Sequence, residues 1–172
     1  MMTTQSSSEQ PADNSLAEIE SLVGQIIRHG GFNLKSTVRK FAAADQDTGA
    51  AGIVVDFEGP DSDLLLEKNA ALLDALEYVV LKAVRVRDDL YGRISFDCKD
   101  WRQVRAEELK LTALMAARQA IESGSPFSLT PMNARERRIV HLALRDEAGV
   151  KTMSEGSGPA RKVVIYPVTT PS

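Results

Sequence analysis

The stretch of this chain that most constrains its fold lies near the C-terminus and runs from Asn133 to Leu144. Asn133 is a favourable helix N-cap, and Glu136 stands three residues later, where its carboxylate can complete a capping box. Apolar residues then recur at helical spacing and predict the buried face of one short helix: Ile139, Leu142 and Ala143. A chain with such a helix must bury this face against other elements.

A basic pair occupies a different face of the same helix. Arg137 and His141 are four residues apart, so their side chains stand one above the other. A planar guanidinium beside an imidazole suits an anion with several oxygen atoms, of which phosphate is the commonest. The imidazole brings a charge only when it is protonated, which for an unperturbed histidine means below about pH 6.5. An ordinary solvated basic face would show the same spacing, so these two residues alone leave both interpretations open.

The helix belongs to a longer pattern. Pro131-Met132-Asn133 precedes it, and Val150, Ser154-Glu155-Gly156 and Arg161-Lys162-Val163-Val164-Ile165 follow it. This pattern resembles the R-x-x-x-H domain ("R-three-H" when spoken), and more closely that of the bacterial Jag family, the SpoIIIJ-associated proteins. The resemblance covers about the last 70 residues. It implies binding of single-stranded nucleic acid, chiefly RNA, with Arg137 and His141 as the signature pair.

The resemblance and the basic side chains together predict a nucleic-acid-binding site. Its candidate members are Arg137, His141, Arg138, Arg145, Arg161 and Lys162, with a further hydrogen bond from Ser154. Such phosphate contacts carry no sequence information, so we expect low sequence specificity for single-stranded RNA or DNA. The glycine-rich loop at 155–159 either holds an anion through its backbone amides or is a plain turn, and the sequence leaves both open.

The N-terminal part of the chain predicts a second α+β domain. A helix is expected over residues 16–29, two strands over 34–44 and 51–58, a helical region over 64–81 and a strand over 93–97. In the Jag family a KH domain precedes the R-x-x-x-H domain, and this order is that of a type II KH domain. We therefore predict a disordered tail at 1–14, a KH-like domain at 15–99, an R-x-x-x-H domain at 100–167 and a tail at 168–172.

One motif of that family is missing. The run Leu73-Asp74-Ala75-Leu76 matches the family and places Glu67-Lys68-Asn69-Ala70 where a Gly-x-x-Gly loop is expected. Those glycines let a KH backbone approach phosphates closely, and a carboxylate at position 67 repels them. We therefore expect a structural KH-like domain. As an alternative function, it would mediate protein interaction or dimerisation, with a small KH-domain protein or a second copy as partner.

Two long helices complete the expectations for the core. In the helix that ends near residue 81, the predicted buried residues are Leu72, Leu73, Leu76, Val79 and Val80. In a helix over residues 101–123 they are Leu111, Leu114, Met115 and Ile121, with alanines between. Trp101, at the start of this helix, is expected to be a packing anchor, although an exposed tryptophan could also stack on a base.

The composition narrows the function classes. Residues 101–172 carry 11 Lys and Arg against 7 Asp and Glu, whereas residues 1–100 carry 10 against 17, so the net charge of -3 masks a basic C-terminal part. A single cysteine excludes an internal disulfide and fits a cytoplasmic protein. No apolar run has the length of a membrane span. No set of side chains suits catalysis or metal binding, so we expect no enzyme activity and no cofactor.

Overall fold

The computed structural model describes residues 10–41, 52–87 and 92–168, and the chain divides into two compact units. The first unit comprises residues 1–101 and the second comprises residues 102–172. The elements of the first unit are α1 (Gln10–Gly30), β1 (Lys35–Phe41), β2 (Gly52–Glu58), α2 (Ser62–Ala83) and β3 (Ile94–Cys98). This is the predicted order, with α2 interrupted by a turn that separates two helical segments.

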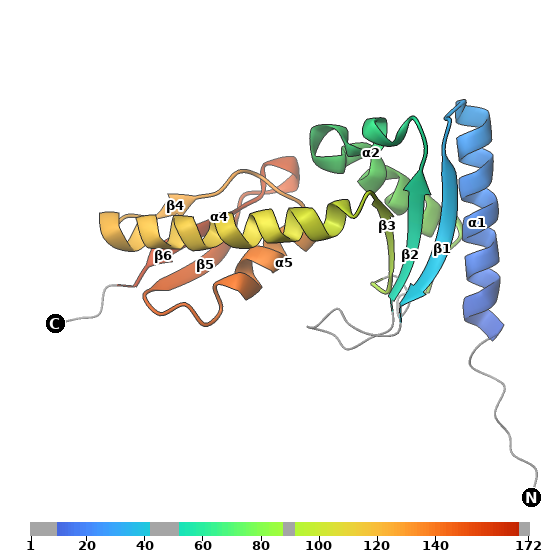
Figure 1. Cartoon of the computed structure of the whole chain (residues 1–172). Coiled ribbons are helices and arrows are strands. Elements are labelled where there is room, and N and C mark those ends of the chain that lie inside the picture. The colour runs from blue at the N-terminus through green and yellow to red at the C-terminus, as the bar shows by residue number, and fades with distance from the viewer. Residues whose placement is uncertain (1–9, 42–51, 88–91, 169–172) are drawn as a thin grey trace, which may run out of the picture. The chain divides into compact units, whose positions relative to one another are not determined.

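The first unit has a mixed three-stranded sheet in the order β1-β2-β3 (Figure 1). β1 is antiparallel to β2, and β3 is parallel to β2 because α2 carries the chain back across the sheet. One face of the sheet packs on α1 and α2 through a core that includes Val55, Phe57 and Phe96. The rings of Phe57 and Phe96 lie 5.5 Å apart in a tilted arrangement, which is favourable for aromatic pairs.

Several boundaries and faces differ from the prediction in the first unit. Helix α1 begins at Gln10, so residues 10–14 are helical and not part of a tail. Residues Leu73 and Val80 of α2 are buried as predicted, but Leu72 and Val79 are 41% and 54% exposed. Leu72 and Val79 each directly precede a buried residue, and neighbouring residues point about 100° apart around a helix. Because α2 packs on one side only, these two side chains fall outside its contact with the sheet. Residues 42–44 and 51, predicted as strand, lie outside the described residues.

The second unit consists of two helices on one face of an antiparallel sheet. Its elements are α4 (Trp101–Ser123, whose first residue belongs to the first unit), β4 (Phe127–Ser128), α5 (Ala134–Ala143), β5 (Val150–Glu155), the 3-10 turn η1 (Gly158–Ala160) and β6 (Lys162–Pro167). The strand order is β4-β6-β5 (Figure 1). β5 and β6 form an antiparallel hairpin.

The orientation of α4 reverses the prediction. Its buried residues are Leu109, Ala113, Ala116, Ala117 and Ala120. The residues predicted to be buried are instead exposed: Leu111 by 63%, Leu114 by 44%, Met115 by 73% and Ile121 by 45%. Small side chains allow α4 to approach the core closely, and the alanine side therefore forms the contact. The four exposed apolar side chains are left on the opposite face.

Trp101 packs against the core of the first unit, as predicted. No helix in the described part of the chain is both long and apolar enough to cross a membrane.

Candidate nucleic-acid interface

The start of α5 is held by the predicted capping box. The Asn133 side-chain oxygen accepts a hydrogen bond from the Glu136 backbone N–H at 2.9 Å, and the Asn133 backbone N–H donates to Glu136 Oε2 at 3.0 Å. The other oxygen of Glu136 accepts from Arg105 Nε of α4 at 2.8 Å. This carboxylate is therefore neutralised, and its repulsion of a nearby anion is weakened.

The buried face of α5 is displaced from the predicted one. Val140 and Leu144 are 0% and 3% exposed, whereas the three residues predicted to be buried, Ile139, Leu142 and Ala143, are only partly buried. Val140 lies three residues after Arg137, and Leu144 lies three residues after His141, so the basic pair stands at the margin of the core. Both basic side chains are half-buried there, and their surroundings limit their freedom.

His141 is fixed at both ring nitrogens by hydroxyl groups of β5. Its Nδ1 lies 2.7 Å from Thr152 Oγ1, and its Nε2 lies 2.9 Å from Ser154 Oγ. Thr152 and Ser154 are two residues apart on one strand, so their side chains lie on the same face of the sheet. The structure thus brings together His141 and Ser154, both predicted members of the site, and adds Thr152.

The protonation of His141 is disfavoured in this setting. Burial lowers the pKa of His141 below its usual value near 6.5, and the neighbouring positive charge of Arg137 lowers this pKa further. The range in which the imidazole is a cation therefore begins at a lower pH than the sequence predicts. A bound anion would oppose both effects because it stabilises the protonated ring.

Arg137 is linked to the start of β6 through one residue. Its Nη1 donates a hydrogen bond to the Met132 carbonyl at 2.9 Å, while the Met132 N–H donates to the Arg161 carbonyl at 3.1 Å. A guanidinium has five N–H donors, so this bond positions the group and leaves further donors for a ligand. The backbone of Arg161, another predicted member, therefore lies close to Arg137.

The other predicted cations are less well placed. Arg138 is exposed on α5, and Arg145 lies beyond the end of this helix, where its Nε is 3.6 Å from Asp146 Oδ2. In the register of the hairpin, Lys162 lies opposite Glu155, next to the pair of Ser154 and Val163. Side chains alternate between the faces of a strand, so Lys162 lies on the sheet face opposite Ser154.

The glycine-rich loop is a structured turn. The backbone N–H of Ala160 donates to Ser157 O, and that of Arg161 donates to Gly158 O, both at 3.2 Å. These two amides stabilise η1, so both are already engaged. They follow the glycine-rich residues 155–159, and the turn that they close supports the interpretation of this segment as a turn.

The sequence provided little signal for two contributors to this arrangement. Thr152 could have been found from its i, i+2 relation to Ser154, because alternate residues share a strand face. The Met132 backbone could not have been found, because any residue except proline has the same N–H and carbonyl groups.

The loop in the first unit adopts the shape of a tight turn without glycine. Lys68, Asn69 and Ala70 have φ values of 51°, 60° and 58°, all in the left-handed region. Such a conformation costs an L-residue roughly 1–2 kcal/mol. The side chain of Ala70 is fully buried in the core, and this packing holds the turn in place. Glu67, Lys68 and Asn69 are all exposed, so the predicted repulsive carboxylate can meet an approaching phosphate.

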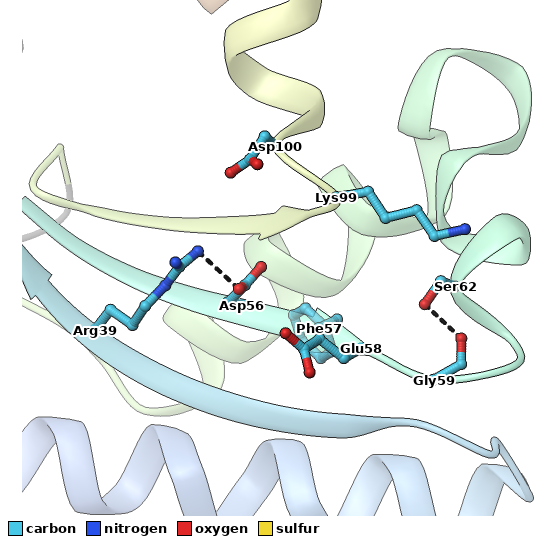
Figure 2. A pocket seen from close by; sticks show the side chains of 8 residues that line it. All are labelled: Arg39, Asp56, Phe57, Glu58, Gly59, Ser62, Lys99 and Asp100. Atoms are coloured by element: carbon cyan, nitrogen blue, oxygen red, sulfur yellow. Dashed lines mark hydrogen bonds and ion pairs between the residues drawn. The ribbon is translucent and has the colours of Figure 1, made fainter.

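A pocket on the first unit does not suit a phosphate chain. It has a volume of about 270 Å³ and is lined by Arg39, Asp56, Phe57, Glu58, Gly59, Ser62, Lys99 and Asp100 (Figure 2). Arg39 is occupied by an ion pair with Asp56 at 2.7 Å. Lys99 lies 2.7 Å from Asp63. Burial raises the pKa of Asp56, although Arg39 opposes this shift. The two remaining carboxylates, Glu58 and Asp100, would repel an anion.

Comparison with known proteins identifies the second unit. Residues 107–167 match the family model of the R-three-H domain, and they contain the entire arrangement around Arg137 and His141. The R-x-x-x-H domain predicted from the sequence is therefore confirmed.

Relatives over a longer part of the chain are proteins named RNA-binding protein KhpB. The relative from Clostridium symbiosum is 36% identical over 111 residues, which cover 64% of this chain and 50% of the relative. The relative from Bacillus subtilis (strain 168) is 32% identical over 109 residues, which cover 62% of this chain and 52% of the relative. The relative from Lactiplantibacillus plantarum is 31% identical over 124 residues, which cover 72% of this chain and 38% of the relative. This chain spans about half or less of their length.

Proposed function

We propose that this chain, which belongs to the Jag family and carries its R-x-x-x-H domain, binds single-stranded RNA through its second unit. The observation that carries the proposal is the fixed pair of Arg137 and His141, with Ser154 and Thr152 bonded to the imidazole. Its relatives' names as RNA-binding proteins support the same ligand class. The ligand would be held by its phosphates, with little discrimination between sequences.

The hydrogen bonds of His141 determine what the two hydroxyl groups can offer. A neutral imidazole has one N–H donor and one acceptor nitrogen, so one of Thr152 and Ser154 must donate its proton to the ring. When Nε2 is protonated, Ser154 Oγ accepts from the ring and its own O–H is free to donate to a phosphate oxygen. When both ring nitrogens are protonated, both hydroxyl groups are free to donate. An anion at Ser154 therefore selects ring states that carry a proton on Nε2.

The geometry also ranks the cations of the site. Arg137 is positioned by the Met132 carbonyl, and the backbone of Arg161 is bonded to Met132, so the Arg161 side chain begins close to this point. Arg138 and Arg145 are exposed and would contribute to the general positive field. Lys162 lies on the other face of the sheet and would contribute least at this point.

A salt titration tests the proposal. Binding of a fluorescein-labelled single-stranded RNA of about 12 nucleotides to the full chain is followed by fluorescence anisotropy over a range of salt concentrations. If three to five phosphates are engaged, the slope of log K against log salt is about -2 to -3.5. The same measurement with a second RNA of unrelated sequence should give a similar slope and affinity, and single-stranded DNA serves as the comparison for the 2′-hydroxyl.

Salt-independent binding would contradict the proposal, because a phosphate-directed site must release counterions. No binding at the lowest salt concentration would also contradict it. A strong preference for one of the two RNA sequences would overturn the part of the proposal that concerns low specificity.

A further inference from the structure

The outer face of α4 carries large apolar side chains that do not pack in the core of the second unit. Five large apolar side chains lie on this face and are between 44% and 73% exposed: Val104, Leu111, Leu114, Met115 and Ile121. The opposite side of the helix, lined mainly by alanines, packs on the core. A helix that buries its alanines and exposes most of its large apolar side chains carries a contiguous apolar strip, and such strips mark interaction surfaces.

The spacing along this strip is that of a helix–helix seam. Val104, Glu107, Leu111, Leu114, Arg118 and Ile121 follow one another at intervals of three and four residues. This alternation brings all six onto one side of α4, where a second helix can pack along them. The two charged members, Glu107 and Arg118, have opposite signs and lie symmetrically about the middle of the strip.

We propose that the outer face of α4 binds the same face of a second copy of this chain, as an antiparallel helix pair. A two-fold axis at the level of residues 112 and 113 places Leu111 against Leu114 of the second copy. It also places Val104 against Ile121, and Glu107 against Arg118. Every contact occurs twice, as an isologous interface requires. The axis falls at the middle of α4, which spans Trp101–Ser123, so the two helices overlap along their whole length.

Charge selects this arrangement over a parallel one. A parallel pair in register would place Glu107 against Glu107 and Arg118 against Arg118, which is repulsive. In the antiparallel pair both charges are matched. Glu107 now contacts Lys110 at 3.0 Å, with side chains 62% and 50% exposed, and such a surface pair is easily exchanged. Arg118 forms no ion pair within the part of the chain that the structure describes.

The surface beside the strip has room for a partner side chain. A hollow of about 430 Å³ is lined by Leu114, Arg118, Ile121, Glu122 and Glu147. In the antiparallel pair, Val104 of the second copy lies against Ile121 and enters this hollow. The interface is one helix wide, so we expect a reversible dimer with a dissociation constant in the micromolar range.

The test is sedimentation equilibrium of the full chain at low salt with charge-swap variants. The parent should show a monomer–dimer equilibrium. Glu107→Arg and Arg118→Glu should each raise the dissociation constant at least about tenfold, because each places like charges against one another. The double variant Glu107→Arg with Arg118→Glu should return it to within about threefold of the parent value. Leu111→Glu should leave only monomer.

Gln119→Arg is the matched control, because it changes the charge of α4 outside the strip and should leave the equilibrium unchanged. All the substituted side chains are exposed, so melting curves by circular dichroism should match that of the parent. A parent that stays monomeric at about 100 µM would overturn the proposal. A double variant that stays as weak as the single variants would also overturn it, because the Glu107–Arg118 register would then be wrong. RNA binding by monomeric Leu111→Glu is measured separately and reports only on the proposed function.

Discussion

The two units offer contrasting solutions at the points where each would meet a phosphate chain. In the first unit the turn at 67–70 begins with a carboxylate and is held by the burial of Ala70. In the second unit the polar groups around α5 are held by hydrogen bonds that involve the imidazole and the guanidinium. Fixed donors are what an anion requires, since their orientation then costs little on binding.

The difference shows that a tight backbone turn and a set of side chains suited to phosphate can occur independently of each other. The first unit keeps a tight turn, yet strained L-residues and Glu67 replace the glycines that would let a phosphate approach. The second unit needs no unusual backbone around Arg137 and His141, because one regular helix and one regular strand already bring the groups together. We therefore expect substitutions in the two regions to separate binding from stability.

The largest expected effect is on binding in the second unit. Arg137→Ala should weaken RNA binding by roughly 1–3 kcal/mol, since it removes a charge-assisted contact. The loss should be similar for unrelated RNA sequences, and the salt slope should become shallower. Anisotropy titrations measure both quantities. Lys68→Ala is the matched control in the first unit and should change the affinity little.

Arg137→Lys sharpens this test because it keeps the charge but loses the planar fork. Its affinity for RNA should lie between those of the parent and of Arg137→Ala. If a folded Arg137→Ala protein binds like the parent, or Lys68→Ala weakens binding as much, the contrast between the two units is wrong.

The next effect is on the stability of the second unit. Asn133→Ala removes the N-cap of α5 and should lower the free energy of unfolding by about 1 kcal/mol. For a unit of this size the loss corresponds to a fall in melting temperature of roughly 4–8 °C. Calorimetry or circular dichroism measures it. An unchanged melting temperature would show that α5 is held by packing of Val140 and Leu144 and not by its cap.

A smaller effect of opposite sign is expected in the first unit. Lys68→Gly relieves a left-handed backbone conformation at an exposed side chain, and the gain exceeds the entropic cost of glycine by about 0.5 kcal/mol. The melting temperature of the first unit should rise slightly. Arg28→Gly, in the regular part of α1, is the control and should destabilise. A fall in stability for Lys68→Gly would mean that its side chain makes contacts that outweigh the strain.

The pH dependence should be modest and confined to the second unit. Because the folded protein depresses the pKa of His141, the unfolded chain binds protons first, and stability falls as the pH drops below about 6.5. RNA binding should tighten over the same range, because phosphate favours the protonated ring. Both responses should be reduced in His141→Gln, which retains His29 as the other histidine. Binding that weakens as the pH falls would contradict this assignment.

The smallest effect is expected from restoring glycines to the first unit. The double variant Glu67→Gly with Ala70→Gly removes a carboxylate and two side chains from the turn, so binding of single-stranded RNA should be unchanged or slightly stronger. The anisotropy titration used for Arg137→Ala measures it. A marked weakening would show that the turn already contributes to binding as it stands.

The sequence by itself determined what depends on near neighbours in the chain. Asn133 and Glu136 predicted the capping box because both bonds join residues three apart. The order of helices and strands followed from residue periodicity, and Arg137 and His141 followed from a local signature. These features need no knowledge of the rest of the fold.

The tertiary structure alone decided which faces are buried and which groups meet. Helix α4 has apolar side chains on opposite sides, so hydrophobicity could not choose between the alanine side and the side of Leu111 and Met115. The partners of His141 lie 11 and 13 residues away and were fixed only when β5 packed against α5. Burial is a property of what packs against a surface, and close packing favoured the side with small residues.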